Sequence, residues 1–273
     1  MTLIVARKHG DMISAVADTK ITVHPSLEAG SRRSLREYDA PVLKLAIVRP
    51  DLLIGVAGDA PPEALTAAAK HWHKGSAEDV LEALKIYTTS NDNGFVVAAL
   101  APARLWRVSN GVVYERTEQG ETWEGDAEPY KTFMERYAEW PDSCPVDFRL
   151  LSSLQALTDG PWSTQHPSVG GHVLHVQTVD NEFRYVPNGS ATFEPTPGNG
   201  IFFTQHFATG IGTTPGAFAA FIEGRQQQLL FVHGEPWEHV PVQAETMEEL
   251  ISAAAELHNQ QLAAAEPPDS QWQ

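Results

Sequence analysis

The sequence predicts an α+β fold in which helices are layered on antiparallel sheets. Apolar runs joined by short turns near the start predict β hairpins. The hydrophobic period then changes to that of helices before strands return. Because strands and helices come in groups and do not alternate one by one, a βαβ repeat with a parallel sheet is not expected.

The first quarter of the chain predicts four strands. Residues 2–10 and 12–22 are apolar runs that meet at the letters HGD, and residues 42–48 and 52–58 repeat the pattern around RPD. Short turns of this kind join antiparallel strands. Since chain termini are usually frayed, a strand this close to the start would hold Thr2 in a fixed place.

The rest of the chain alternates between groups of helices and groups of strands. The helical period predicts helices at 61–75, 77–90, 126–140, 146–159 and 246–265. Further strands are predicted at 95–102, 104–116 around the turn SNG, 171–180, 182–186, 201–212, 219–225 and 228–234. Residues 188–200 are predicted to form a loop, because their Gly, Pro and Asn content leaves few residues for a ladder. Residues 266–273 are predicted to be a disordered tail.

Charge and composition exclude several classes of partner. The 273 residues carry a net charge of -16 and no dense Lys/Arg cluster, which argues against nucleic acid or an anionic membrane. The interrupted basic stretch SRRSLRE is interpreted as a solvated loop. The sequence shows neither a secretory signal nor a long apolar segment, so we expect a cytoplasmic protein with no membrane partner. The single cysteine, Cys144, lies in a turn-rich stretch and is not expected to act as a nucleophile.

Four residues of the first 58 carry a resemblance to a known family. Thr2, Asp18, Lys44 and Gly58 follow in the order typical of proteasome-type N-terminal nucleophile (Ntn) hydrolases. The intervals from Thr2 to Asp18 and from Lys44 to Gly58 match that family, while the loop between Asp18 and Lys44 is longer. The chain resembles proteasome β subunits, the bacterial proteasome-like peptidase and further bacterial proteins of proteasome type. The resemblance covers residues 2–190, and residues 191–265 are expected to complete the same domain.

The resemblance implies a fold, an assembly and a substrate class. It implies a four-layer αββα sandwich of antiparallel sheets, a homo-oligomer and a peptide or amide substrate. No cofactor and no metal are expected. An alternative to the hydrolase stays open: the chain could be a catalytically silent subunit of the same fold that serves as a scaffold or binding module.

The chemistry of the four residues agrees with the resemblance. A threonine hydroxyl is a weak nucleophile, but a free α-amino group on the same residue can accept its proton once Met1 is removed. Lys44 near the hydroxyl would stabilise the alkoxide, and Asp18 would hold the lysine. The N–H of Gly58 can approach a reacting carbonyl as an oxyanion donor. Taken singly, each residue has an ordinary structural explanation, and only the joint spacing favours an active site.

One part of the family pattern is absent. Where the family has an Asp and a Ser before a Gly-Gly pair, this chain has His166 and Val169. The supporting hydroxyl and carboxylate beside Thr2 are therefore missing, or are supplied by Ser168 or by Asp126. Of these two, Asp126 is preferred.

Other motifs are interpreted as structural. The glycines of GIGTTPGAF lack the βαβ setting of a dinucleotide site. His71 and His73 diverge on a helix, and His172 and His175 fall on opposite faces of a strand. No third ligand accompanies either pair, so no metal site is predicted.

Overall fold

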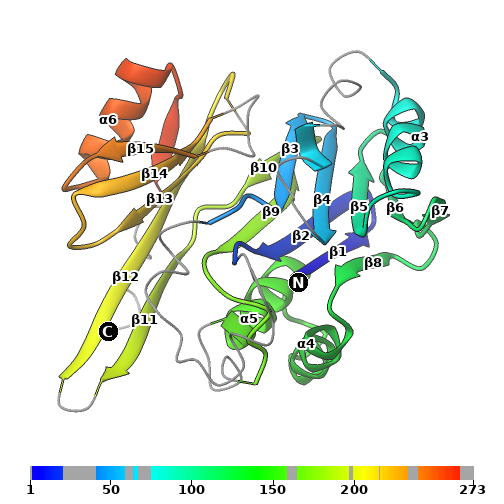
Figure 1. The fold of residues 1–273 in the computed structure, drawn as a ribbon, viewed down its shortest axis with the longest axis horizontal. Coiled ribbons are helices and arrows are strands. Elements are labelled where there is room, and N and C mark those ends of the chain that lie inside the picture. The colour runs from blue at the N-terminus through cyan, green and yellow to red at the C-terminus, as the bar shows by residue number, and fades with distance from the viewer. Residues whose placement is uncertain are drawn as a thin grey trace. The chain divides into compact units, whose positions relative to one another are not determined.

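The computed structural model describes residues 2–20, 41–58, 64–66, 75–158, 165–196, 199–214, 216–232 and 239–264. The chain divides into two compact units, Met1–Arg184 and Tyr185–Gln273. Helices pack on several sheets whose described strand pairings are antiparallel, as the sequence predicts (Figure 1). That residues 191–265 complete the domain of the first unit stays a prediction. The predicted tail and the basic stretch SRRSLRE lie outside the described residues.

The first sheet of the first unit has the strand order β10-β9-β2-β1-β8. Its members are β1 (Leu3–His9), β2 (Met12–Asp18), β8 (Glu121–Gly125), β9 (Val173–Val179) and β10 (Glu182–Tyr185). The predicted hairpin is confirmed, because Ile4 pairs with Ala17 and His9 with Met12. Its turn contains Gly10 at a φ of 61°, which glycine adopts at little cost.

Strand β8 is missed by the sequence analysis. Its letters ETWEG contain two glutamates and a glycine, all poor strand formers, and only five residues lie in the strand. Pairing with β1, from Leu3↔Gly125 to Arg7↔Glu121, supplies the order that local propensity does not. The strand forms one edge of the first sheet and lies beside the start of the chain.

The second sheet is a meander of consecutive strands. It contains β3 (Leu45–Arg49), β4 (Leu52–Gly58), β5 (Asn93–Ala99), β6 (Arg104–Ser109) and β7 (Val112–Glu115). The predicted turns RPD and SNG are confirmed. In the second of them Asn110 and Gly111 have φ values of 52° and 70°, as a two-residue hairpin turn requires. The two sheets approach closely where Gly55 lies against Ile4, since an added Cβ would be 2.9 Å from Ile4 Cγ2.

Three helices whose bounds the structure describes pack on these sheets. They are α3 (Ala77–Tyr87), α4 (Ala127–Glu139) and α5 (Val146–Thr158). Helix α3 begins with a capping box between Ser76 and Asp79 and contacts strands of the second sheet. Helices α4 and α5 pack on the first sheet through a core that includes Val5, Val16 and Leu154. Of the helix predicted at 61–75, only residues 64–66 and 75 are described, and 64–66 are helical.

The described part of the second unit is a sheet with one helix. The path β11 (Gly189–Thr196), β12 (Asn199–Gly210), β13 (Phe218–Ile222), β14 (Gln227–Phe231) and β15 (His239–Gln243) is joined by β16 (Leu262–Ala264), which pairs with β12. Helix α6 (Met247–His258) ends at Asn259, whose left-handed backbone terminates it before the predicted end at 265. The predicted loop at 188–200 is wrong. Residues 189–196 form β11, which tolerates Pro195 because it lies at the sheet edge.

Candidate active site

Thr2 and Asp18 meet at the open end of the hairpin of β1 and β2. Thr2 precedes β1 and Asp18 ends β2, and the pairing of Ile4 with Ala17 brings them together. Both are buried, with 2% of Thr2 and 0% of Asp18 exposed. Thr2 Oγ1 donates a hydrogen bond to Asp18 Oδ1, and the N–H of Leu3 donates to the same oxygen over 3.0 Å. A carboxylate therefore orients the Thr2 hydroxyl.

The second oxygen of Asp18 is also fully engaged. Asp18 Oδ2 accepts from Lys44 Nζ at 3.1 Å, from the N–H of Lys20 at 3.2 Å and from the N–H of Gly170 at 3.3 Å. A buried carboxylate is costly unless it is paired and hydrogen-bonded. Here backbone N–H groups, a hydroxyl and an ammonium share that role. The contribution of Gly170 was not predicted, because only the folded chain brings it to the end of β2.

Lys44 is held next to Asp18 just before β3. Its side chain is 2% exposed, and Nζ donates to the Lys20 carbonyl as well as to Asp18. Burial lowers the pKa of Lys44 below its usual value, and the attraction of Asp18 offsets part of this shift. Among the described residues no hydrogen bond joins Lys44 to Thr2. Lys44 therefore reaches the Thr2 hydroxyl through Asp18.

Gly58 ends β4 on the wall of the cavity that Thr2 also lines. Its φ is 116°, and an added Cβ would lie 2.2 Å from the Asp92 carbonyl oxygen. Both facts require glycine at this position. The role of the Gly58 N–H as an oxyanion donor stays a prediction.

Asp126 and Ser168, the two alternatives for the missing support, are hydrogen-bonded to each other. Ser168 Oγ donates to Asp126 Oδ2 over 2.9 Å, and Asp126 also caps the start of α4 by accepting from the N–H of Glu128. The N–H of Asp126 donates to the Thr2 carbonyl over 2.9 Å. The hydroxyl of Ser168 and the carboxylate of Asp126 thus lie together, and the backbone of Asp126 is hydrogen-bonded to Thr2.

His166 and Val169 take other roles. The Nε2 of His166 lies 2.8 Å from the Thr132 hydroxyl, and Val169 is buried in the core under α4 and α5. Burial lowers the pKa of His166, although the charge of Asp126 opposes this. Neither side chain replaces the family residues at these positions.

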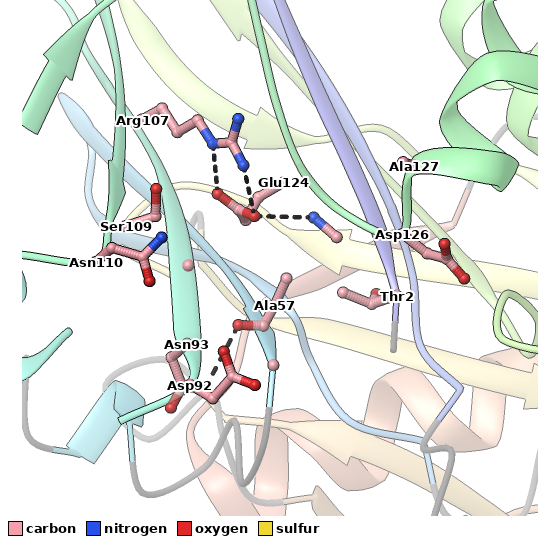
Figure 2. Close-up of a pocket in the computed structure, with 13 residues that line it drawn as sticks. Thr2, Ala57, Asp92, Asn93, Arg107, Ser109, Asn110, Glu124, Asp126 and Ala127 are labelled. Atoms are coloured by element: carbon pink, nitrogen blue, oxygen red, sulfur yellow. Dashed lines mark hydrogen bonds and ion pairs between the residues drawn. The ribbon is translucent and has the colours of Figure 1, made fainter. Parts of the chain in front are cut away.

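A cavity of about 360 Å³ opens beside Thr2 (Figure 2). The residues that line it come from the ends of strands in both sheets and from the start of α4: Thr2, Ala57, Gly58, Asp92, Asn93, Gly94, Arg107, Ser109, Asn110, Glu124, Gly125, Asp126 and Ala127. Most of these side chains are polar or charged. The cavity is large enough for a side chain or a small polar ligand next to the Thr2 hydroxyl.

Comparison with known proteins identifies the fold. No protein-family model matches the chain, and no curated protein matches it either. Among solved structures, the Anbu (Gly-1) mutant from Hyphomicrobium sp. strain MC1 is 14% identical with a TM-score of 0.50, over 68% of this chain and 85% of that chain. The fold is proteasome-like. Eukaryotic HslV from Trypanosoma brucei is 13% identical with a TM-score of 0.48, over 64% of this chain and 98% of that chain.

The proteasome-like core carries a second ion pair near Thr2 that the sequence analysis misses. Arg107 Nε lies 2.7 Å from Glu124 Oε2, and the guanidinium also donates to Oε1 over 3.2 Å. Glu124 fits there because Gly94 has no side chain, as an added Cβ would lie 2.2 Å from the Glu124 Cδ. The pair joins β6 of one sheet to β8 of the other. No local sequence motif predicts the Arg107–Glu124 contact, because it depends on how the two sheets stack.

The remaining motifs of the sequence take the following places in the described part of the chain. Within it, no three His, Cys, Asp or Glu side chains gather in a way that could hold a metal ion. His71 and His73 lie outside the described residues, while His172 and His175 are buried. Cys144 is a free, half-buried thiol in the turn before α5. No described helix has the length and apolar character needed to span a bilayer.

Proposed function

We propose that the chain is an Ntn amide hydrolase, a threonine peptidase whose nucleophile is Thr2 after removal of Met1. The observation that supports it best is the hydrogen bond from Thr2 Oγ1 to Asp18, with Lys44 on the other oxygen of the same carboxylate. Few structural needs explain a lysine and an aspartate buried together at the first strand, since burying both charges is costly. The adjoining cavity gives a substrate carbonyl a route to the hydroxyl.

The proposed reaction proceeds in two stages. The freed α-amine accepts the Oγ1 proton while Oγ1 attacks the amide carbon, and the carbonyl electron pair moves to oxygen. The C–N bond then breaks, the departing amine takes the proton from the α-ammonium, and an ester to Thr2 remains. Water attacks this ester with the same amine as base, which releases the acid and restores Thr2.

The neighbouring groups have separate tasks in this proposal. Asp18 orients the hydroxyl, and the nearby ammonium of Lys44 favours the developing negative charge on Oγ1. The N–H of Gly58 would stabilise the oxyanion. Asp126, with Ser168, would replace the missing family support by fixing the backbone of Thr2 and providing a carboxylate beside the amine.

Covalent trapping tests the nucleophile. Intact mass first establishes that the purified protein begins at Thr2, and a peptide epoxyketone, which bonds both hydroxyl and amine, is then added. We expect an adduct that peptide mapping places on Thr2, that persists in Cys144→Ser and that is lost in Thr2→Ala. An adduct on Cys144, or none at all in protein shown to begin at Thr2, would contradict the proposal.

The alternative is a catalytically silent subunit that acts as a scaffold or binding module. It is favoured by His166 and Val169, whose side chains bond Thr132 and fill the core instead of supporting Thr2. A retained Met1 would block the amine and favour this alternative. The same intact-mass measurement therefore separates the two functions before any substrate is tried.

Further parts of the proposal come from the resemblance and, for the location, from the sequence itself. The arrangement would be a four-layer αββα sandwich, which the packing of α4 and α5 on the first sheet and of α3 on the second supports. The protein would be cytoplasmic and would form a homo-oligomer. Its substrate would be a peptide or another amide. Light scattering that showed only a monomer of 29.9 kDa would remove the assembly from the proposal.

A further inference from the structure

A second cavity of about 370 Å³ lies in the first unit, beside the open edge of β8. Its lining includes Arg107, Arg116 and Thr122, and Arg107 also lines the cavity of Thr2. The proposed hydrolase mechanism uses none of the groups that are confined to this second cavity. Two arginines in one cavity are notable in a chain whose net charge is -16.

Strand register places the two arginines on one face of the second sheet. Arg107 pairs with Tyr114 across β6 and β7, and the N–H of Arg116 donates to the Leu105 carbonyl over 2.8 Å, which continues that register. Residues two apart on a strand share a face. Arg107 and Arg116 are therefore diagonal neighbours, whose Cβ atoms are typically about 7–8 Å apart and within reach for long side chains.

The charges of the two arginines are not equally compensated. Arg107 holds Glu124 at 2.7 Å, whereas Arg116 has no carboxylate partner among the described residues and only contacts the Tyr114 ring, 5.8 Å from its centroid. The one carboxylate in the lining, Glu121, already binds Arg7 and the Tyr130 hydroxyl. The cavity consequently has an excess of positive charge that no described side chain neutralises.

Thr122 contributes an unused donor on the opposite wall. It has the same strand parity as Glu124 and so faces the second sheet, where the arginines lie. The residue is 3% exposed, and its Oγ1 has no hydrogen-bond partner in the described part of the chain. A buried hydroxyl without a partner is costly, and an acceptor in the cavity would satisfy it.

We infer that this cavity binds a phosphate group, as inorganic phosphate or a small phosphate monoester. Planar guanidinium groups donate in pairs to phosphate oxygens, and a tetrahedral anion can accept from Arg107, Arg116 and Thr122 from different directions at once. A carboxylate has two coplanar oxygens and suits this three-sided arrangement less well. The inference stands independently of the proposed hydrolase function.

Calorimetric titration of the full-length protein with inorganic phosphate tests the site. Sodium chloride holds the ionic strength constant, and acetate is titrated in parallel. We expect saturable binding of phosphate at one site per chain, and binding of acetate at least tenfold weaker. Absence of saturable heat with phosphate, or acetate binding as tight as phosphate, would overturn the inference.

Variants assign the binding to this cavity. Arg116→Ala should weaken phosphate binding at least tenfold, and Thr122→Val should weaken it several-fold without changing charge. The matched control is Arg104→Ala. Arg104 lies on β6 like Arg107 but faces the other side of the sheet, and it is already paired with Glu115 and Glu78. Equal weakening by Arg104→Ala, or undiminished binding by both cavity variants, would contradict the assignment. If Arg116→Ala does not fold, Arg116→Gln and Thr122→Val carry the same test.

Discussion

The two ion pairs near Thr2 differ in their access to solvent. Lys44 and Asp18 are 2% and 0% exposed, and backbone groups engage both partners. Arg107 and Glu124 are 29% and 10% exposed, and Arg107 borders two cavities. The first pair is buried and hydrogen-bonded to the backbone, whereas Arg107 of the second pair borders a cavity in which it can contact a ligand.

This difference separates two kinds of site residue. A buried pair with saturated hydrogen bonds holds one geometry, which chemistry at a fixed hydroxyl needs. A pair whose arginine is partly exposed and borders two cavities holds its strand in place, but this arginine can exchange partners at a lower desolvation cost. Glu124 Oε1 also accepts from the N–H of Gly125, 3.2 Å away, so the outer pair braces the end of β8 that contacts Thr2.

The largest effect is expected at the inner pair. Lys44→Met keeps the length of the side chain but leaves Asp18 buried without a cation, which should lower the free energy of unfolding by about 3–5 kcal/mol. Urea denaturation measures the loss. The control is Lys85→Met, since Lys85 is 40% exposed and pairs with Glu82 on the surface of α3, where less than about 0.5 kcal/mol is expected. Equal losses in the two variants would break the comparison.

The stability of the fold should also depend on pH through His175, a buried residue on β9. Burial lowers the pKa of His175 to about 4 from its usual 6.5, and neither ring nitrogen has a hydrogen-bond partner among the described residues. The unfolded chain takes up the proton first as pH falls. The contribution of neutral His175 to the free energy of unfolding is therefore fully present above pH 6.5. It is lost as pH falls toward 4, by about 3 kcal/mol in total.

Denaturation of wild type and His175→Leu between pH 7 and about pH 4 measures this term. The variant should lose this part of the pH dependence, and its stability at pH 7 should not fall by much, because leucine removes two unpartnered nitrogens from the core. Parallel pH profiles of the two proteins would show that His175 does not titrate in this way.

A smaller effect is expected at the outer pair. Glu124→Gln preserves the shape beside Gly94 but removes the charge that holds Arg107, and should cost about 1–2 kcal/mol of unfolding free energy. Glu115→Gln is the matched control, because Glu115 binds Arg104 at the surface and is 50% exposed. A loss at Glu124 as large as that at Lys44 would place the two pairs in one class. A loss no larger than at Glu115 would remove the bracing role.

Sequence reasoning reached the parts of this site that are local or evenly spaced. The turns at Gly10 and Asn110 mark their hairpins, and the position of Thr2 before a strand places it opposite the end of β2, where Asp18 lies. Contacts between residues of separate strands and loops could not be predicted from the sequence. Gly170 and the Arg107–Glu124 pair come together only through sheet pairing and stacking, which no nearby residues encode.

The same limit explains the errors in the fold. Strand β8 and strand β11 have weak local propensity, and each is ordered by a long partner, β1 in one case and β12 in the other. The sequence favours Asp126 over Ser168 as the support of Thr2, but it does not predict that the two residues are hydrogen-bonded to each other. The two residues are far apart in the chain, and only the packing of α4 beside the segment before Gly170 joins them.

The smallest effect is expected where Ser168 meets Asp126, because that bond is buried on one side only. Ser168 is 5% exposed, while Asp126 is half-buried and keeps its helix-capping bond without the serine. Ser168→Ala should therefore cost about 1 kcal/mol of unfolding free energy. Ser252→Ala, which removes an exposed hydroxyl bonded to Glu256 over 3.1 Å, should cost close to nothing. A double-mutant cycle with Asp126→Asn isolates the coupling, expected at about 0.5–1 kcal/mol. Zero coupling would mean that Ser168 and Asp126 hold their positions independently, and that the contact of Asp126 with Thr2 rests on backbone pairing alone.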